Sequence, residues 1–128
     1  MKLIFILFGI LLLTAQTCQK TQSELPPTLF GHWVHSFEED KPAIQTYRPA
    51  SYAFPLARGR EGFELKENGN FVLHSIGPAD GTEPITGTWK STSKNTIQVS
   101  FNNDGMAPYT IQLIHITDSL LTLKKIIN

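Results

Sequence analysis

The feature that most constrains this chain is a series of short runs in which apolar and polar residues alternate, between residues 60 and 125. A period of two is typical of strands with one buried face, and no segment of this part repeats apolar residues at helical spacing over a sufficient length. The runs predict six strands, at residues 60–67, 71–76, 85–90, 97–101, 109–116 and 120–125. The fold class is therefore expected to be all-β.

Turn residues separate these runs, and two more strands are expected before them. Asn68-Gly69 is the strongest short hairpin signal, because both central residues of that turn need a positive φ. Residues 29–37 are expected to form a strand with Trp33 and Phe37 on one face, and another strand is expected within 43–54. All prolines fall outside the six alternating runs, and Pro84 and Pro108 directly precede strand starts.

Eight short sequential strands with tight turns leave no room for crossover helices and predict an antiparallel meander. Such a meander protects its edges best by closing, so a single up-and-down barrel is expected, with a two-sheet sandwich as the alternative. A barrel of eight strands is only just wide enough to be filled by side chains or to hold one small ligand. Residues that could fill it are Trp33, Phe63, Phe71, Trp89, Ile97, Phe101 and Leu113.

The N-terminus has the pattern of an exported protein. Lys2 is followed by an uncharged, apolar-rich stretch at 3–15, too short for a membrane span, so residues 1–17 are predicted to be a signal peptide. The single cysteine, Cys18, comes next, and residues 15–18 resemble the lipobox of bacterial lipoproteins. This resemblance implies that Cys18 carries the lipid and becomes the mature N-terminus; the alternative is ordinary cleavage that leaves a free thiol. Residues 18–28 are expected to be a tether, and Gln19 favours the outer membrane.

The remaining part, residues 29–128, resembles small bacterial lipocalin-like proteins of the calycin type. Gly31-His32-Trp33 is similar to the G-x-W motif that opens their first strand, and Gly87-Thr88-Trp89 is similar to the second such motif. The resemblance implies an up-and-down barrel in which these glycines permit close backbone approach. It also implies that Trp33 and Trp89 close the barrel floor.

Several functional classes are disfavoured by the composition. Eleven basic residues balance eleven acidic ones, which gives no electrostatic case for binding nucleic acid. One cysteine excludes a disulfide scaffold and a cysteine-based zinc site. The histidines at 32 and 35 should point to opposite faces of a strand, and His74 and His115 lack a neighbouring ligand at metal-binding spacing. Neither a metal, a cofactor nor catalytic residues are therefore expected, and the protein is not predicted to be an enzyme.

A cluster of arginines is the main candidate binding site. All three arginines of the chain fall within residues 47–61, interleaved with tyrosines. Because guanidinium groups bind carboxylates and phosphates and stack on aromatic rings, a site for a small amphipathic or anionic molecule at the barrel mouth is one interpretation. Its members would be Tyr47, Arg48, Tyr52, Arg58 and Arg60. The alternative is that these arginines pair with the acidic residues at 38–40 or 61 and pin a long loop.

Two functions follow from these interpretations. The first is a lipid-anchored outer-membrane protein that binds a small amphipathic or anionic molecule at the open end of its barrel. The second is a protein-interaction module that presents the 38–60 loop to an envelope assembly partner or to a hydrolase that it inhibits. A deep apolar cavity would favour the first function, and a filled lumen with an ordered, protruding loop would favour the second.

Overall fold

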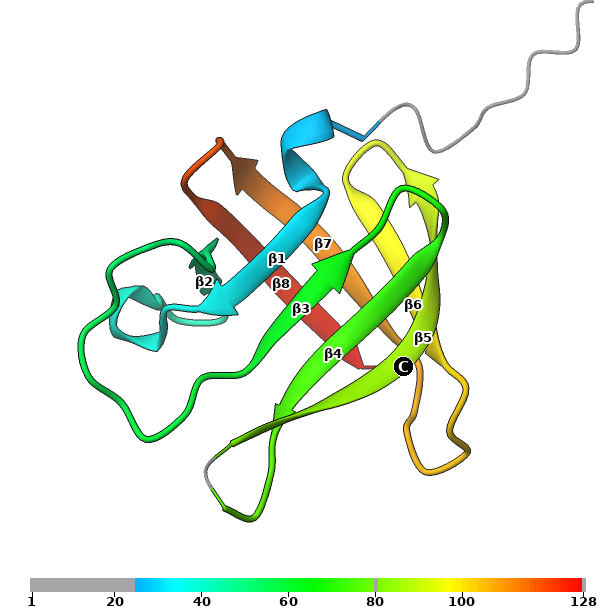
Figure 1. Ribbon diagram of the computed structural model, residues 1–128. Coiled ribbons are helices and arrows are strands. Elements are labelled where there is room, and N and C mark those ends of the chain that lie inside the picture. The colour runs from blue at the N-terminus through cyan, green and yellow to red at the C-terminus, as the bar shows by residue number, and fades with distance from the viewer. Residues whose placement is uncertain (1–24, 80, 128) are drawn as a thin grey trace, which may run out of the picture.

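The computed structural model describes residues 25–79 and 81–127, which form eight strands in one closed antiparallel barrel (Figure 1). The predicted signal peptide and Cys18 lie outside the described residues. The strands are β1 Gly31–His35, β2 Gln45–Pro49, β3 Gly62–Leu65, β4 Asn70–Ile76, β5 Thr82–Ser93, β6 Thr96–Phe101, β7 Tyr109–Ile116 and β8 Leu121–Ile127. Two short 3-10 helices, η2 at Pro27–Leu29 and η3 at Phe37–Glu39, accompany them. In this part of the chain no helix is long and apolar enough to cross a membrane.

The strand order around the barrel is β1-β2-β8-β7-β6-β5-β4-β3, and β3 closes on β1. From β3 to β8 each strand pairs with the next one along the chain, as the tight turns predicted. The all-β fold and the closed barrel are thereby confirmed. Since β1 lies between β2 and β3, the connection at residues 50–61 has to pass β1, and it swings away from the barrel at the left of Figure 1.

Two local predictions were wrong. β1 ends at His35, so Phe37 does not share a strand face with Trp33; it lies in η3 and its side chain is 47% exposed. Pro84 does not precede a strand but lies inside β5, paired with His74 of β4. The pairing of β5 with β6 begins only at Gly87, so one edge of β5 is free at Pro84, which is where a strand tolerates proline.

The barrel interior is filled by side chains. Its buried apolar residues include Trp33, Phe63, Leu65, Phe71, Leu73, Trp89, Ile97, Val99, Ile111, Leu113, Leu121 and Leu123. Phe71 is 0% exposed and lies at the centre of an aromatic cluster. The centroid of its ring is 5.6 Å from that of Phe63, 6.0 Å from Phe101 and 6.4 Å from Tyr109. Residues that alternate along the strands and come from opposite walls thus pack into one hydrophobic core.

The two tryptophans contact η2 and the residue that follows it, and η2 lies over one end of the barrel (Figure 1). The Trp33 indole Nε1 donates a hydrogen bond to the Leu29 carbonyl at 2.9 Å, and the Trp89 ring packs 5.8 Å from that of Phe30. Leu25, which falls within the predicted tether, is only 3% exposed and belongs to the core. The segment that precedes β1 therefore helps to close this end of the barrel.

The two motif glycines have backbone roles. Gly31 adopts a φ of 141°, a conformation that side-chain-bearing residues rarely take. At Gly87 a Cβ atom would lie 2.3 Å from the Ser100 carbonyl oxygen, so only glycine permits this approach of β5 to β6. The first glycine is needed for its conformation and the second for space.

Candidate functional site

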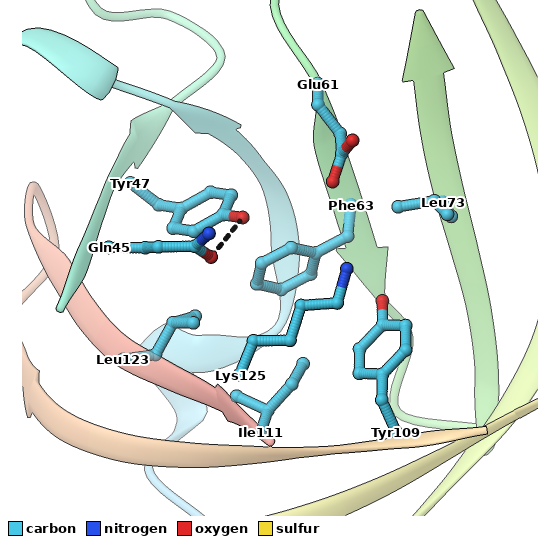
Figure 2. Close-up of a pocket in the computed structure, with 9 residues that line it drawn as sticks. All are labelled: Gln45, Tyr47, Glu61, Phe63, Leu73, Tyr109, Ile111, Leu123 and Lys125. Carbon is cyan, nitrogen blue, oxygen red and sulfur yellow. Dashed lines mark hydrogen bonds between the residues drawn. The ribbon is translucent and has the colours of Figure 1, made fainter. Parts of the chain in front are cut away.

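The barrel mouth lies at the end opposite η2 and contains a cavity of only ≈ 10 Å³ (Figure 2). Its lining residues are Gln45, Tyr47, Glu61, Phe63, Leu73, Tyr109, Ile111, Leu123 and Lys125. This volume has room for about one water molecule, whereas pockets for small organic ligands typically measure roughly 300–1,000 Å³. The lumen is therefore filled at this end as well.

Two tyrosines close the mouth from within. Tyr47 on β2 is 5% exposed and Tyr109 on β7 is 6% exposed, and burial raises the pKa of both phenols. The Tyr47 hydroxyl donates a hydrogen bond to Gln45 Oε1 at 3.3 Å (Figure 2). The Lys125 ammonium lies 4.3 Å from the centroid of the Tyr109 ring. The mouth thus carries a polar rim over an apolar interior.

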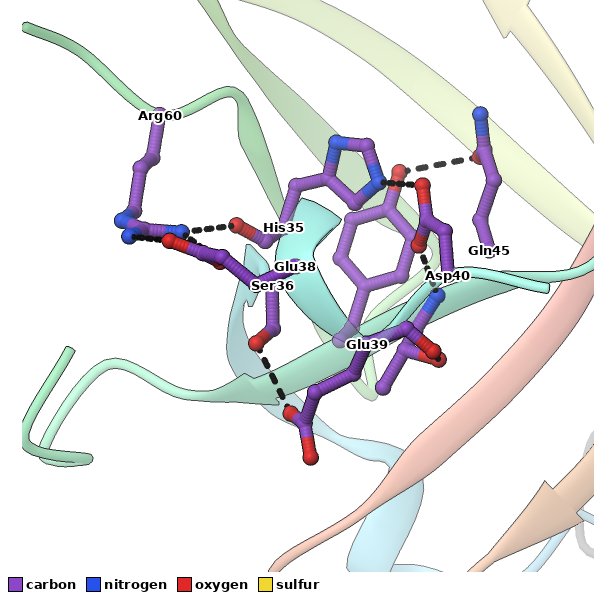
Figure 3. Close-up of polar contacts among 9 residues, drawn as sticks. His35, Ser36, Glu38, Glu39, Asp40, Gln45 and Arg60 are labelled. Carbon is purple, nitrogen blue, oxygen red and sulfur yellow. Dashed lines mark hydrogen bonds and ion pairs between the residues drawn. The ribbon is translucent and has the colours of Figure 1, made fainter. Parts of the chain in front are cut away.

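Beside the mouth, the turn between β1 and β2 is held by a network of polar contacts (Figure 3). The Ser36 hydroxyl donates to Glu39 Oε2 at 2.8 Å, and the Thr46 backbone N–H donates to Asp40 Oδ1 at 2.8 Å. The other Asp40 oxygen lies 2.9 Å from His35 Nε2. Because Ser36 and Thr46 are themselves buried, this network fixes the turn to the barrel.

Arg48, on β2, joins three segments of the chain. Its Nε and Nη2 groups donate to the Glu39 carboxylate at 2.9 and 2.6 Å, and its Nη1 group donates to the Ser119 carbonyl at 2.9 Å. The guanidinium carbon lies 4.9 Å from the centroid of the Tyr52 ring. Hydrogen bonds from Arg48, and secondarily from Ser36, lower the pKa of Glu39 to about 2. The pair is therefore ionised and bidentate at neutral pH.

Arg60, just before β3, anchors the 50–61 connection. Both of its terminal nitrogens donate to the Glu38 carboxylate, and Nη2 also donates to the Pro55 carbonyl at 2.8 Å. The guanidinium carbon lies 4.6 Å from the centroid of the Phe37 ring and 4.8 Å from that of Phe54. With its side chain only 9% exposed, Arg60 is enclosed by the segment that it orders.

The predicted binding residues do not converge on one site. Tyr47 alone among them lines the mouth cavity. Arg48 and Arg60 are paired with glutamates, Tyr52 lies against the Arg48 guanidinium, and Arg58 is exposed. Arg48 and Arg60 form ion pairs with acidic residues at 38–40 and hold a long loop in place, as the alternative interpretation expected.

The same region exposes apolar side chains to solvent. Seven large apolar residues are exposed in the described part of the chain, and three of them, Phe37, Tyr52 and Leu56, belong to residues 36–61. Leu56 is fully exposed, at 105%, and directly follows the residue whose carbonyl Arg60 holds. The loop can therefore present the Leu56 side chain to a partner from a backbone that the Arg60 hydrogen bond holds in place.

Sequence reasoning missed a second grouping, on the outer face of the barrel. His32, Glu64 and His74 lie on β1, β3 and β4, and one ligand atom from each lies within 4.8 Å of the others. His115, in contrast, is exposed on β7 and lies outside this group. Only the pairing of β1 with β3 brings the three together, and no local spacing in the sequence signals that pairing.

Comparison of this chain with protein-family models, with curated proteins and with solved structures finds no match.

Proposed function

We propose that this protein is a protein-interaction module of the bacterial envelope, and that residues 50–61 form its recognition loop. The observation that carries the proposal is the full exposure of Leu56 next to a backbone carbonyl held by the enclosed Arg60 side chain. An isolated exposed leucine is ordinary on a protein surface. An exposed leucine on an ordered loop of irregular structure is instead a good anchor for a partner.

The filled lumen supports this function over the binding of a small molecule. The mouth cavity of ≈ 10 Å³ is too small for an amphipathic ligand, and the barrel core is packed with aromatic and aliphatic side chains. Arg48 and Arg60 already use their guanidinium groups on carboxylates of this chain, so an incoming anion would have to displace Glu39 or Glu38.

The ordering of the recognition loop favours binding energetically. A loop whose backbone is fixed before contact loses less conformational entropy when it binds, so more of the contact energy appears as affinity. Leu56 offers an aliphatic side chain that an apolar pocket would desolvate. The partner we propose is a folded envelope protein with such a pocket, either an assembly partner or a hydrolase whose specificity pocket Leu56 would fill.

Photo-crosslinking in the host tests this proposal. A benzoylphenylalanine at Ala57, beside Leu56, should give one discrete protein adduct, and the adduct should disappear when Leu56 is changed to Asp. The same probe at Lys94, in the turn between β5 and β6, should give none. With the identified partner purified, Leu56→Ala should weaken binding about 30-fold, as truncation of an interface anchor commonly does, whereas Ile76→Ala should not change it.

Two results would contradict the recognition loop. One is a partner affinity that Leu56→Ala leaves unchanged. The other is a small molecule that stays bound, in native mass spectrometry, to protein purified from its own host, because a filled lumen has no room for it.

The attachment to a membrane is proposed from the sequence alone. A lipobox-like segment ends at Cys18, so an acyl anchor there and a location at the outer membrane are part of the proposal. Palmitate labelling in the host should mark the wild-type protein, and Cys18→Ala should abolish the label and release the protein from the membrane fraction. Unchanged membrane association of that variant would refute the anchor.

A further inference from the structure

The cluster of His32, Glu64 and His74 has the composition of a metal site. Glu64 lies directly opposite His32 across the β1–β3 pair, and His74 lies on β4, the other neighbour of β3. Glu64 Oε1 is 3.8 Å from His32 Nδ1 and 3.6 Å from His74 Nε2. Two imidazoles and a carboxylate thus converge from three adjacent strands.

Gly62 makes this convergence possible. It stands opposite His74 on β4 and opposite Val34 on β1, so it occupies the outer position of β3 between the two histidine strands. A Cβ atom there would lie 2.5 Å from the Trp33 carbonyl oxygen and 3.4 Å from His32 Nε2. The space left by the glycine lets the rings of His32 and His74 approach to 4.5 Å between centroids.

One atom of the cluster lacks a partner. His74 Nε2 is buried and is the single buried side-chain nitrogen or oxygen without a hydrogen bond in residues 25–79 and 81–127. Buried polar atoms are almost always satisfied, so an unpartnered imidazole nitrogen 3.6 Å from a carboxylate oxygen points to a ligand or an ion between them. This observation is independent of the composition of the cluster.

The charges around the cluster suit a cation. Burial, and then the neighbouring His74, lower the pKa of His32, whereas Glu64 raises it. Glu64 turns its Oε1 atom to both histidines, and its Oε2 atom lies 4.0 Å from the Lys66 ammonium. One carboxylate oxygen is therefore left for the cluster, while the other faces the lysine.

We propose that His32 Nδ1, Glu64 Oε1 and His74 Nε2 bind one Zn²⁺ ion on the outer face of the barrel. In tetrahedral zinc sites with bonds of about 2.0–2.1 Å, neighbouring ligand atoms lie about 3.3–3.4 Å apart. The ligand atoms here lie within 4.8 Å of one another, so side-chain rotations would bring them to these separations. Imidazole nitrogens favour Zn²⁺ over Mg²⁺ or Ca²⁺. The three ligands leave the fourth position open to solvent, for a water molecule or a donor from another protein.

Such an ion would link the strands at which the barrel closes. The β1–β3 pair joins strands that are not consecutive in the chain, and the proposed ligands come from β1, β3 and β4. Bound Zn²⁺ would then stabilise the folded state, by an amount that grows with the logarithm of the free Zn²⁺ concentration once this exceeds the Kd. None of the proposed ligands belongs to the recognition loop, so this role is separate from the binding of a partner by Leu56.

Calorimetric titration of the full chain, stripped with EDTA and then exposed to Zn²⁺ alone, tests the site. We expect one ion per chain and a melting temperature that rises with Zn²⁺. His32→Gln and His74→Gln should each weaken binding at least tenfold and remove the rise in melting temperature. His115→Gln, on the exposed part of β7, is the matched control and should bind Zn²⁺ as the wild type does.

Co²⁺ provides a readout that does not depend on the stability of the variants. The wild-type protein loaded with Co²⁺ should show the intense visible absorption of tetrahedral coordination, and Glu64→Ala should lose it while its circular dichroism keeps the barrel spectrum. The proposal is overturned if the wild-type protein binds no Zn²⁺. It is equally overturned if the His32→Gln/His74→Gln double variant binds Zn²⁺ with wild-type stoichiometry and affinity.

Discussion

Replacing Phe71 with alanine is expected to lower the free energy of unfolding by about 3–5 kcal/mol. The side chain is 0% exposed and packs against the rings of Phe63, Phe101 and Tyr109, which come from β3, β6 and β7. Alanine would leave a cavity among three walls of a barrel that cannot easily collapse around it. Because small domains are stable by only about 5–15 kcal/mol, this one substitution should remove a large share of the total.

Urea unfolding followed by tryptophan fluorescence measures this effect, since Trp33 and Trp89 are both buried and report on the core. Leu56→Ala is the control, because a fully exposed side chain should change the free energy of unfolding by less than about 0.5 kcal/mol. A loss below about 1 kcal/mol for Phe71→Ala would mean that the aromatic cluster is not the packing centre of the barrel.

The strands could be predicted from the sequence because each has one buried face. In a filled barrel, inward and outward residues alternate along each strand, so a period of two marks the strands directly. The Asn68-Gly69 signal correctly predicted the hairpin between β3 and β4. The expectation that both residues have a positive φ was wrong, because only Gly69 has one and the hydrogen-bonded turn runs from Lys66 to Gly69. Phe37 was misplaced because periodicity does not reveal where a strand ends; β1 stops two residues earlier, and the Phe37 ring instead covers the Arg60 guanidinium.

The candidate site was less accessible to sequence reasoning because it depends on contacts between distant residues. The arginine-rich segment could be found from composition, but composition does not show whether a guanidinium is free. Arg60 reaches Glu38 across 22 positions of the chain, and Arg48 reaches the Ser119 carbonyl across 71. The histidine cluster was missed for the same reason, since His32 and His74 meet only when β3 is inserted between β1 and β4.

Replacing Arg60 with alanine is expected to lower the free energy of unfolding by about 2–3 kcal/mol and to disorder residues 50–61. Because Glu38 is solvated, the ion pair itself adds little, and most of the loss comes from the packing of the Arg60 guanidinium against the Phe37 and Phe54 rings. The variant would also leave the carbonyls of His35 and Pro55 without their donor. Hydrogen exchange should show faster exchange confined largely to this loop.

Arg58→Ala is the matched control, because Arg58 lies two positions away and is exposed. It should change neither the stability nor the exchange rates, whereas Arg60→Lys, which keeps the charge but cannot bind the carboxylate with a planar fork, should be intermediate. Equal effects of Arg58→Ala and Arg60→Ala would show that charge, and not the enclosed geometry of Arg60, orders the loop.

The same variant separates the order of the recognition loop from its contact residue. In Arg60→Ala the Leu56 side chain is still present, so any loss of affinity for the partner reflects the entropy of ordering the loop again on binding. We expect Arg60→Ala to lower the affinity for the partner and Arg58→Ala to leave it unchanged. A disulfide or a proline that restores the loop conformation should recover the lost affinity. If Arg60→Ala lowered only the melting temperature and left binding intact, the pinning of the loop would serve the stability of the barrel alone.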